Sequence, residues 1–195
     1  MTAKAVAGPS ARERLLAAAN ELFYAEGVHT VGIDRVIERA GVAKASLYNT
    51  FGSKDELVKA YLQGRHARTA ARISRCVERY DDPRARLLGV FDAQDEMFAD
   101  PEFRGCAFAA ASAESPGEAV TSATDDYRGW MRGLLTSLAR EAGAPEPAAL
   151  ARQLHMIYDG AGLSMRLDRD RTAAEDARSA AETLLDAALA SRAAG

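Results

Sequence analysis

The chain has 195 residues, of which 48% are hydrophobic and 27% are charged, and this balance excludes a disordered or fibrous protein. The net charge of −3 does not by itself indicate nucleic-acid binding. However, residues 1–65 carry nine basic and seven acidic side chains, whereas the remainder of the chain is acidic. The N-terminal third is therefore the part expected to meet phosphate groups.

No segment approaches the roughly 18 apolar residues of a membrane-spanning helix, and the first residues lack the apolar core of a signal peptide. We therefore expect a cytoplasmic protein with no membrane partner. The two cysteines, Cys76 and Cys106, match no metal-ligand spacing. No nucleophile with an adjacent base and no phosphate-binding loop is evident. The sequence thus indicates neither an enzyme nor a metal or cofactor site.

Helical periodicity runs through nearly the whole chain. Apolar residues recur three and four positions apart, alanine is abundant, and no segment alternates in the period-two manner of a strand. Three segments open with a Ser/Thr-x-x-Glu capping box, at Ser10, Ser53 and Thr172. The sequence therefore predicts an all-α fold. The expected helices cover residues 10–25, 32–40, 43–50, 53–80, 83–99, 103–112, 120–142, 147–167 and 173–190.

Residues 32–51, GIDRVIERAGVAKASLYNTF, have the pattern of a helix-turn-helix. Ile33, Val36 and Ile37 give its first helix an apolar face, and Gly41 allows a tight turn. A helix that reads DNA needs a face without bulk or negative charge, because that face enters the major groove. The outward residues of the second helix meet this need. They are Lys44, Ala45, Ser46, Tyr48, Asn49 and Thr50.

Residues 41–57, GVAKASLYNTFGSKDEL, are similar to the signature of the TetR family of transcriptional regulators. The shared elements are a G-V-x-x-x-x-L-Y-x-x-F core and a following S-K-x-x-L helix start, and the resemblance covers residues 12–62. It implies an N-terminal three-helix DNA-binding domain over residues 10–56. It also implies a C-terminal helical domain for ligand binding and dimerisation over residues 57–195.

By the same resemblance, Tyr48 and Lys54 contact DNA phosphates, and Lys44 contacts a phosphate or a base edge. Asn49 occupies a position that sets sequence preference, and an asparagine can pair with an adenine edge through two hydrogen bonds. The chain departs from the family pattern at Ala43, where many members have a serine or threonine as the N-cap of the reading helix. The expected partner is double-stranded operator DNA.

Large apolar side chains recur in the C-terminal region, with polar residues such as Gln94, Asp95 and His155 close to them. Two interpretations remain open: spacing alone favours a plain core, whereas buried polar groups favour a cavity for a small-molecule effector. His155 and Asp159 lie one turn apart, but two potential metal ligands without a third are weak evidence for a metal site. The candidate ligand-binding residues are Phe91, Gln94, Asp95, Phe98, Phe108, Tyr127, Trp130, Met131 and His155.

Small residues line the last two expected helices, and small side chains let helices approach closely. The pattern fits a helix pair within one chain or the interface of a homodimer. The homodimer is favoured because helix-turn-helix proteins read two half-sites related by two-fold symmetry. The candidate interface residues are Gly160, Ala161, Ala177, Ala181, Leu184 and Ala188.

The sequence therefore predicts a DNA-binding transcriptional regulator, with a homodimeric repressor released by a small apolar or aromatic effector as the favoured form. A regulator controlled by a protein partner and an activator with the same DNA-binding domain remain alternatives. A row of arginines at helical spacing along residues 53–80 is expected to be solvated or paired with carboxylates rather than bound to DNA. These arginines are Arg65, Arg68, Arg72, Arg75 and Arg79.

Overall fold

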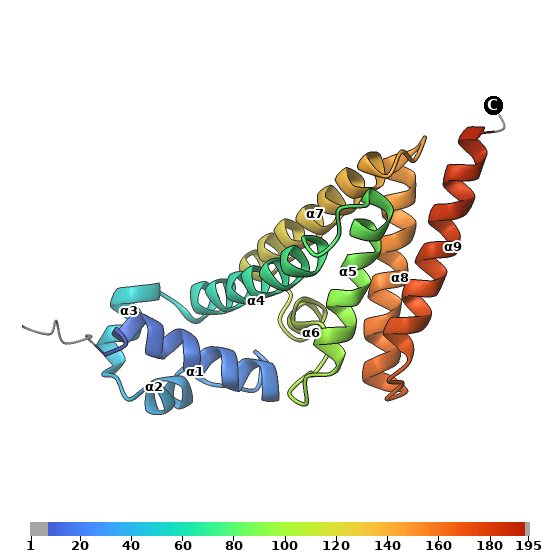
Figure 1. Ribbon diagram of the computed structural model, residues 1–195. Coiled ribbons are helices and arrows are strands. Elements are labelled where there is room, and N and C mark those ends of the chain that lie inside the picture. Colours follow the sequence, from blue (N-terminus) through green and yellow to red (C-terminus); the bar gives the residue numbers. More distant parts are fainter. Residues whose placement is uncertain (1–7, 194–195) are drawn as a thin grey trace, which may run out of the picture. The chain divides into compact units, whose positions relative to one another are not determined.

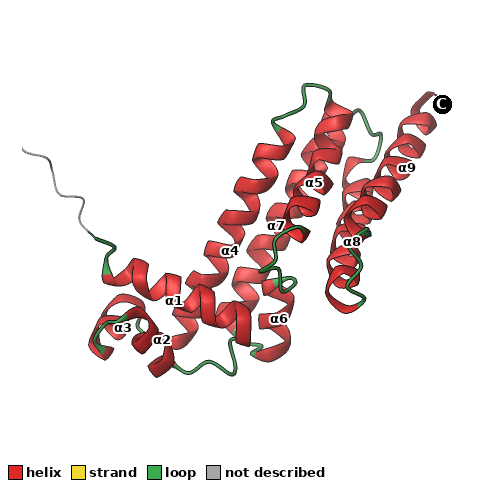
Figure 2. Cartoon of the chain, turned by 60° about the horizontal axis from the view of Figure 1, so that its bottom comes forward, coloured by secondary structure: helices red, strands yellow, loops and turns green. Residues whose placement is uncertain are grey.

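The computed structural model describes residues 8–193 of the chain. Over this range the protein is all-helical, as predicted, and contains no strand (Figure 2). The helices are α1 (Ala11–Glu26), α2 (Ile33–Ala40), α3 (Lys44–Phe51), α4 (Lys54–Val77), α5 (Pro83–Phe98), α6 (Ala107–Glu114), α7 (Glu118–Glu141), α8 (Pro147–Leu167) and α9 (Ala173–Ala193) (Figure 1). Within the described part of the chain, no helix is long and apolar enough to cross a membrane.

The predicted capping boxes are present to different degrees. Ser10 and Glu13 form a complete box, because the Ser10 hydroxyl accepts from the Glu13 N–H while the Glu13 carboxylate accepts from the Ser10 N–H at 2.7 Å. The Ser53 hydroxyl accepts from the Glu56 N–H at 3.1 Å. The Thr172 hydroxyl instead donates to the carboxylates of two nearby aspartates. Local hydrogen bonding thus fixes the starts of α1 and α4 much as the sequence predicts.

The start of α6 is the clearest departure from the expected helix bounds. The sequence predicts a helix over residues 103–112, whereas α6 begins at Ala107. Gly105 has a φ of +96°, a conformation that ends helical geometry and that residues with a side chain rarely adopt. The remaining helices lie close to their predicted positions.

The chain divides into two compact units, and each is described separately. Unit 1 comprises residues 8–65 and 107–124, and unit 2 comprises residues 66–106 and 125–193. Two of the three boundaries fall inside α4 and α7, and the third lies directly before α6. This division differs from the contiguous one expected from the sequence, because α6 and the first turns of α7 belong to the same unit as the N-terminal helices.

Each unit has its own apolar core. In unit 1, α1, α2 and α3 contact one another around side chains with no exposed area, including Leu15, Val36 and Leu47. In unit 2, α9 packs against α5 and α8, and Figures 1 and 2 both show α8 and α9 side by side. Ion pairs add to the α5–α9 contact, for example between Arg84 and Asp186 at 2.9 Å. The short helices of unit 1 and the long ones of unit 2 are thus held by separate sets of buried side chains.

Candidate nucleic-acid interface and ligand site

The short helix α3 is held by a glycine turn on one side and buried leucine packing on the other. Gly41 ends α2 in the left-handed conformation, with a φ of 62° and a ψ of 43°. Arg14 of α1 donates a hydrogen bond of 3.3 Å to the Gly41 carbonyl. Leu47 anchors α3 in the core, and the Arg12 guanidinium lies 5.7 Å from the centre of the Phe51 ring. One face of α3 is therefore fixed, and the other is left to solvent.

The residues predicted to contact DNA fall mostly on the solvent face of α3. Ser46 is half-buried, as is Lys54 at the start of α4. The Thr50 hydroxyl donates to the Ser46 carbonyl at 2.6 Å, so Thr50 offers a partner an acceptor rather than a donor. None of the predicted residues is in the core of unit 1. The exposed members are Lys44, Ala45, Tyr48, Asn49 and Thr50.

Lys44 has an acidic neighbour that the sequence analysis did not identify. Its ammonium forms an ion pair with Asp34 of α2 at 2.9 Å, and this hydrogen bond raises the pKa of Lys44 above its ordinary value. Both side chains are mostly exposed, so the pair is weak and Lys44 can exchange Asp34 for a phosphate. The two residues are ten positions apart on different helices, and no periodic signal in the sequence joins them.

The N-terminus of α3 has no side-chain cap. Ala43 occupies the N-cap position in an extended conformation, and its side chain has no group that could accept a hydrogen bond. This is the position where the sequence departs from the family pattern. The Ser46 N–H donates to the Ala43 carbonyl at 2.9 Å, whereas the N–H groups that precede it in α3 have no side-chain cap and can bind water or an approaching anion.

A carboxylate of α6 contacts the turn between α1 and α2 within unit 1. Glu114 accepts a hydrogen bond of 3.2 Å from the backbone N–H of His29. Its side chain also lies against Gly27, which has a φ of +93°, so closely that an added Cβ would fall 2.4 Å from a Glu114 oxygen. The glycine is therefore required both for its conformation and for the close approach of Glu114. No pattern in the sequence indicates this contact.

The candidate ligand residues of unit 2 are mostly buried. Trp130 is half-buried, and its ring lies 6.0 Å from that of Tyr127 and 4.8 Å from that of His66. Asp95 is exposed, which corrects the expectation that it adjoins the apolar face, because it lies about 100° around α5 from Gln94. Phe108 is also buried, but it belongs to unit 1. The buried members in unit 2 are Phe91, Gln94, Phe98, Tyr127, Met131 and His155.

Gln94 and His155 are the buried polar residues in the described part of the chain, at 1% and 3% exposure, and each has an atom without a partner. The Gln94 amide nitrogen donates to the Tyr158 carbonyl at 2.7 Å, which leaves its Oε1 unpaired. His155 Nε2 lies 3.7 Å from an Asp159 carboxylate oxygen, within range of an ion pair but beyond a hydrogen bond. Nε2 therefore has no hydrogen-bond partner, and burial lowers the pKa of His155 while the charge of Asp159 opposes this shift.

The surroundings of these two residues favour uncharged groups. Burial raises the pKa of both Tyr127 and Tyr158, so their hydroxyls stay protonated. The charge of Asp159 is matched by Arg128, whose guanidinium lies 2.9 Å away. Among the described residues, no group of three His, Cys, Asp or Glu side chains could hold a metal ion. Arg132 and Arg72 also act electrostatically on His155 and Tyr158, respectively, so the cluster has positive charges beyond the Arg128–Asp159 pair.

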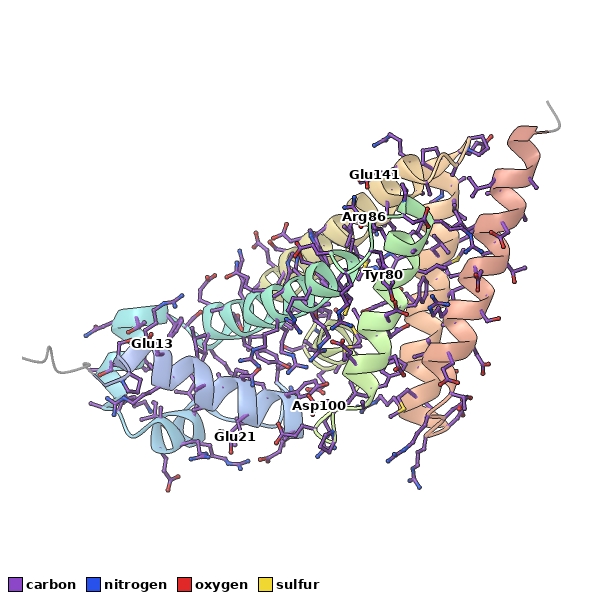
Figure 3. All side chains as sticks on the ribbon, viewed as in Figure 1. Glu13, Glu21, Tyr80, Arg86, Asp100 and Glu141 are labelled. Carbon is purple, nitrogen blue, oxygen red and sulfur yellow. The ribbon has the colours of Figure 1, made fainter. Side chains whose placement is uncertain are left out.

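A separate groove of about 440 Å³ lies between α4, α5 and α7 in unit 2. Its walls are polar and apolar in nearly equal measure, and of the candidate ligand residues it includes Trp130. Figure 3 shows Arg86 of α5 beside Glu141 of α7, and their side chains form an ion pair of 3.2 Å. The groove is lined by Ala70, Ala71, Ile73, Ser74, Val77, Glu78, Arg86, Trp130, Leu134, Ser137, Leu138 and Glu141.

The small residues of α8 and α9 serve the packing of the chain itself. Ala161, Ala177 and Ala181 are buried at 7%, 6% and 0% exposure, which corrects their assignment to a surface that faces a second copy. They allow the close contact between α8 and its neighbours inside unit 2. Gly160 is exposed, while Leu184 and Ala188 are half-buried. The large apolar side chains that do face solvent on α8 are Met156, Leu163 and Leu167.

The arginine row, which runs along α4 and ends just beyond it at Arg79, includes paired side chains, as expected from the sequence. The Arg65 guanidinium lies 3.6 Å from the centre of the Tyr24 ring within unit 1. Arg79 forms an ion pair with Glu96 of α5 at 2.6 Å within unit 2. The first and last arginines of the row therefore contact other side chains of the protein.

Comparison with known proteins adds independent information. Residues 15–61 match the model of the family described as bacterial regulatory proteins, tetR family. A solved structure of a TetR-family transcriptional regulator from Streptomyces coelicolor is 34% identical in sequence, with a TM-score of 0.85. The alignment covers 91% of this chain and 95% of that one. The likeness therefore extends over both units and not only over the matched N-terminal segment.

The curated relatives cover different parts of the chain. The transcriptional repressor NemR of Escherichia coli is 28% identical over 182 residues, which are 85% of this chain and 89% of NemR. The transcriptional activator FasR of Mycolicibacterium smegmatis is 38% identical over 82 residues, 42% of this chain. The chain spans 37% of the length of FasR in that match. Both a repressor and an activator thus occur among the relatives.

Proposed function

This chain belongs to the TetR family of bacterial regulatory proteins, and on that premise we propose that it is a homodimeric repressor whose effector is a small, largely apolar molecule. Regulation of transcription through a helix-turn-helix is the activity of its relatives, and they are not enzymes. The operator contacts, the dimer, the direction of control and the effector are the finer parts of this proposal.

The exposed face of α3 is the observation that carries the proposal. It presents Tyr48 and Asn49 to solvent and has no acidic side chain, while Leu47 fixes the opposite face. Such a face suits the major groove, with Asn49 at a base edge and Tyr48 and Lys54 at phosphates. Exchange of Asp34 for a phosphate would add Lys44 to these contacts.

A row of exposed apolar side chains on α8 supports a two-fold dimer. Met156, Leu163 and Leu167 are 66%, 58% and 66% exposed, and with Gly160 they follow a spacing of four, three and four residues. This spacing places them on one side of the helix, and the glycine permits close approach. A second copy is the favoured occupant because an operator with two half-sites requires two reading helices.

The unpaired atoms of Gln94 and His155 support control by a small molecule. Buried polar atoms without partners are rare, and a bound effector could supply the missing hydrogen bonds. The two reading helices of a dimer must be about 34–36 Å apart to enter successive major grooves. An effector that binds better to a state with a different spacing therefore weakens DNA binding. A tenfold loss of affinity requires about 1.4 kcal/mol of such coupling.

The proposal is tested by selecting genomic DNA fragments with the full-length protein and titrating the enriched site. We expect a pseudo-palindromic operator with half-sites about 10 base pairs apart or a multiple of that spacing. Its position over the promoter would indicate repression, and a position upstream would indicate activation. Enrichment of single, non-repeated half-sites would contradict the dimer, and no enrichment would contradict specific DNA binding.

Leu163→Glu tests the dimer itself. A charge within an apolar contact is costly, so sedimentation should show a monomer with unchanged helix content and weaker operator binding. Gln63→Glu is the matched control, because it adds a carboxylate at an exposed position of α4, away from the row on α8. A variant that sedimented like wild type would remove Leu163 from the interface.

A further inference from the structure

The groove between α4, α5 and α7 has the size of a ligand site. Its volume of about 440 Å³ is within the range of small-molecule pockets, which is about 300–1,000 Å³. All of its lining residues belong to unit 2. On the side of α4 the lining runs from Ala70 to Glu78, which corresponds to about 12 Å at a rise of about 1.5 Å per residue. The groove can therefore hold an elongated molecule.

The two ends of the groove differ in chemistry. At one end the Trp130 ring lies 4.8 Å from the ring of His66, just before the α4 part of the lining. At the other end Glu141, the last residue of α7, forms its ion pair of 3.2 Å with Arg86 (Figure 3). Glu78 lies at this second end, because it directly follows α4 and precedes the turn to α5. The apolar residues between the ends are Ala70, Ala71, Ile73, Val77, Leu134 and Leu138.

The polar end of the groove offers hydrogen-bond acceptors. The Ser74 hydroxyl donates to a Glu78 carboxylate oxygen at 2.6 Å, and the Ser137 hydroxyl donates to a Glu141 oxygen at 3.3 Å. A hydroxyl has a single hydrogen, so both serines are already used as donors. A carboxylate accepts several hydrogen bonds, so Glu78 and Glu141 can still accept from a ligand. A partner with several N–H groups suits this end.

The lining carries an excess of negative charge. Its charged residues are the two carboxylates, Glu78 and Glu141, and the one guanidinium of Arg86. Both α4 and α7 end here and only α5 begins here, so two helix C-termini with partial negative charge exceed one N-terminus. Burial lowers the pKa of His66 beside Trp130, so its imidazole adds no positive charge at about pH 7.

The other arginines of these helices are directed away from the groove. Arg79 pairs with Glu96 of α5 at 2.6 Å, and Arg75 also acts on that carboxylate. Arg84 pairs with Glu182 of α9 at 2.8 Å. The arginines that act on residues of α8 are Arg72, Arg128 and Arg132.

Arg68 and Arg140 are turned away by helical geometry. Each lies six positions from a residue at the centre of the lining, Ser74 on α4 and Leu134 on α7, which is about 120° around the helix. None of these eight arginines is among the residues that line the groove. A ligand at Glu78 and Glu141 therefore meets the excess negative charge of the lining.

We propose that this groove binds a hydrophobic organic ammonium ion. The apolar body of the ligand lies between α4 and α7, with its far end at Trp130, and the ammonium donates its N–H groups to Glu78 and Glu141. Charge-assisted hydrogen bonds of this kind are stronger than those of a neutral donor. The site goes beyond the proposed function, because binding here does not require that the ligand release the operator.

Three probes of one shape test the charge requirement on the full-length protein. They are 4-phenylbutylammonium, the neutral 4-phenylbutanol and the anionic 4-phenylbutanoate. Trp130 is the single tryptophan of the chain and lines the groove, so its fluorescence reports binding at this site. We expect the ammonium to bind about tenfold or more tightly than the alcohol, and the carboxylate to bind least well. An ionic strength of about 0.5 M should narrow these differences, because salt screens exposed charges.

Substitutions of opposite sign assign the preference to the groove. Glu78→Gln removes one carboxylate and should reduce the preference for the ammonium over the alcohol to about threefold or less. Arg86→Gln removes the competing guanidinium and should increase that preference. Glu175→Gln is the matched control, because Glu175 is exposed on α9 and does not line the groove. Circular dichroism and the affinity for the alcohol show whether each variant keeps its fold and the apolar part of the site.

The outcomes separate this site from the proposed function. Equal binding of the ammonium and the alcohol, or no response to any of the three probes, overturns the site. A Trp130 signal that depends only on protein concentration would assign the groove to a second copy and also overturns it. A preference reduced equally by Glu78→Gln and Glu175→Gln would reflect the charge of the whole chain and not the groove. Binding of the ammonium without release of labelled operator supports the site and contradicts only its use for effector control.

Discussion

Units 1 and 2 place their polar side chains in opposite ways. In unit 1 the polar residues of interest are exposed, and pairs such as Lys44 with Asp34 lie at the surface, where partners can be exchanged. In unit 2 the polar residues of interest, Gln94 and His155, are buried and incompletely paired. A surface built for a large, charged partner can stay solvated until it binds. On the proposed function, an interior effector site has to keep an unsatisfied polar group until the ligand binds.

This difference predicts different responses to mutation. Substitutions on the exposed face of unit 1 should change DNA binding and leave stability almost unaffected. Substitutions inside unit 2 should change stability as well as any ligand response. The experiments below separate the two regions, beginning with the largest expected effect.

Ala181→Glu should destabilise unit 2 by about 3–5 kcal/mol, because it places an unpaired carboxylate where the alanine has no exposed area. Thermal unfolding followed by circular dichroism measures the loss. Ala180→Glu is the matched control, since the preceding residue is exposed on the same helix and should tolerate the charge. Equal stability of the two variants would contradict the packing of α9 in unit 2.

Two substitutions in unit 1 should weaken operator binding in different ways. Asn49→Ala should cost about 1–3 kcal/mol and relax base preference at one position of each half-site, because it removes a base contact. Lys54→Ala should weaken binding to all sequences and lower the salt dependence by about one ion, because it removes a phosphate contact. Titrations across a salt series with cognate and altered operators distinguish the two effects.

Lys59→Ala controls for the general loss of a positive charge. Lys59 is on α4 five positions after Lys54, which places it about 140° further around the helix. The salt dependence of operator binding by Lys59→Ala should stay close to that of the wild type. If Asn49→Ala and Lys54→Ala both bound like the wild type, the proposed use of the α3 face would be wrong.

Ala43→Ser should stabilise unit 1 by about 1 kcal/mol. The serine hydroxyl would accept a hydrogen bond from an N–H group at the start of α3, which has no side-chain cap in the natural chain. Urea unfolding measures the gain, and Ala45→Ser, within α3, is the control in which no gain is expected. A lower stability for Ala43→Ser would mean that the extended N-cap geometry is not retained.

Lowering the pH should decrease the free energy of unfolding of unit 2, and this is the smallest of the four effects predicted here. Burial lowers the pKa of His66 and His155 from the ordinary value of 6.5. Below pH 6.5 the unfolded chain therefore binds protons that the folded chain does not, and the free energy of unfolding falls as the pH falls toward the folded-state pKa values. The contribution is absent above that range, where both states are neutral.

His155→Leu should flatten part of this pH dependence. Unfolding curves measured between pH 5 and pH 8 would show the change, since this range spans the ordinary titration of histidine, about pH 6.5. His29→Gln is the control, because His29 is an exposed residue of unit 1. A slope that is unaffected by His155→Leu would assign the pH dependence to His66 or to other groups.

The sequence predicted unit 1 in more detail than unit 2. The helix-turn-helix depends on local signals, such as the left-handed Gly41 and the apolar spacing of Leu47 and Phe51, and these signals suffice to place α2 and α3. Its exposed face follows directly from helical periodicity. The pairing of Lys44 with Asp34 did not follow, because it depends on how two helices are brought together.

In unit 2 the sequence identified Gln94 and His155 as polar residues beside apolar faces, and both are buried. It misplaced Asp95, because a difference of one residue on a helix turns a side chain by about 100°. It also assigned Ala181 to the subunit surface, whereas this alanine packs inside its own chain. Small residues mark close helix contacts, but periodicity alone does not say whether the neighbour belongs to the same chain.

The discontinuous make-up of unit 1 limits how the protein can be cut or recombined. The chain passes between the units at residues 65–66, 106–107 and 124–125, so a fragment ending near residue 65 would lack α6. Such a fragment would leave Gly27 and the His29 N–H without Glu114. A hybrid regulator that combines this DNA-binding region with the effector region of a relative should therefore transfer α6 together with α1–α3. A junction made only near residue 65 would combine the α1–α2 turn of this chain with the α6 of the relative, which need not carry the Glu114 contact.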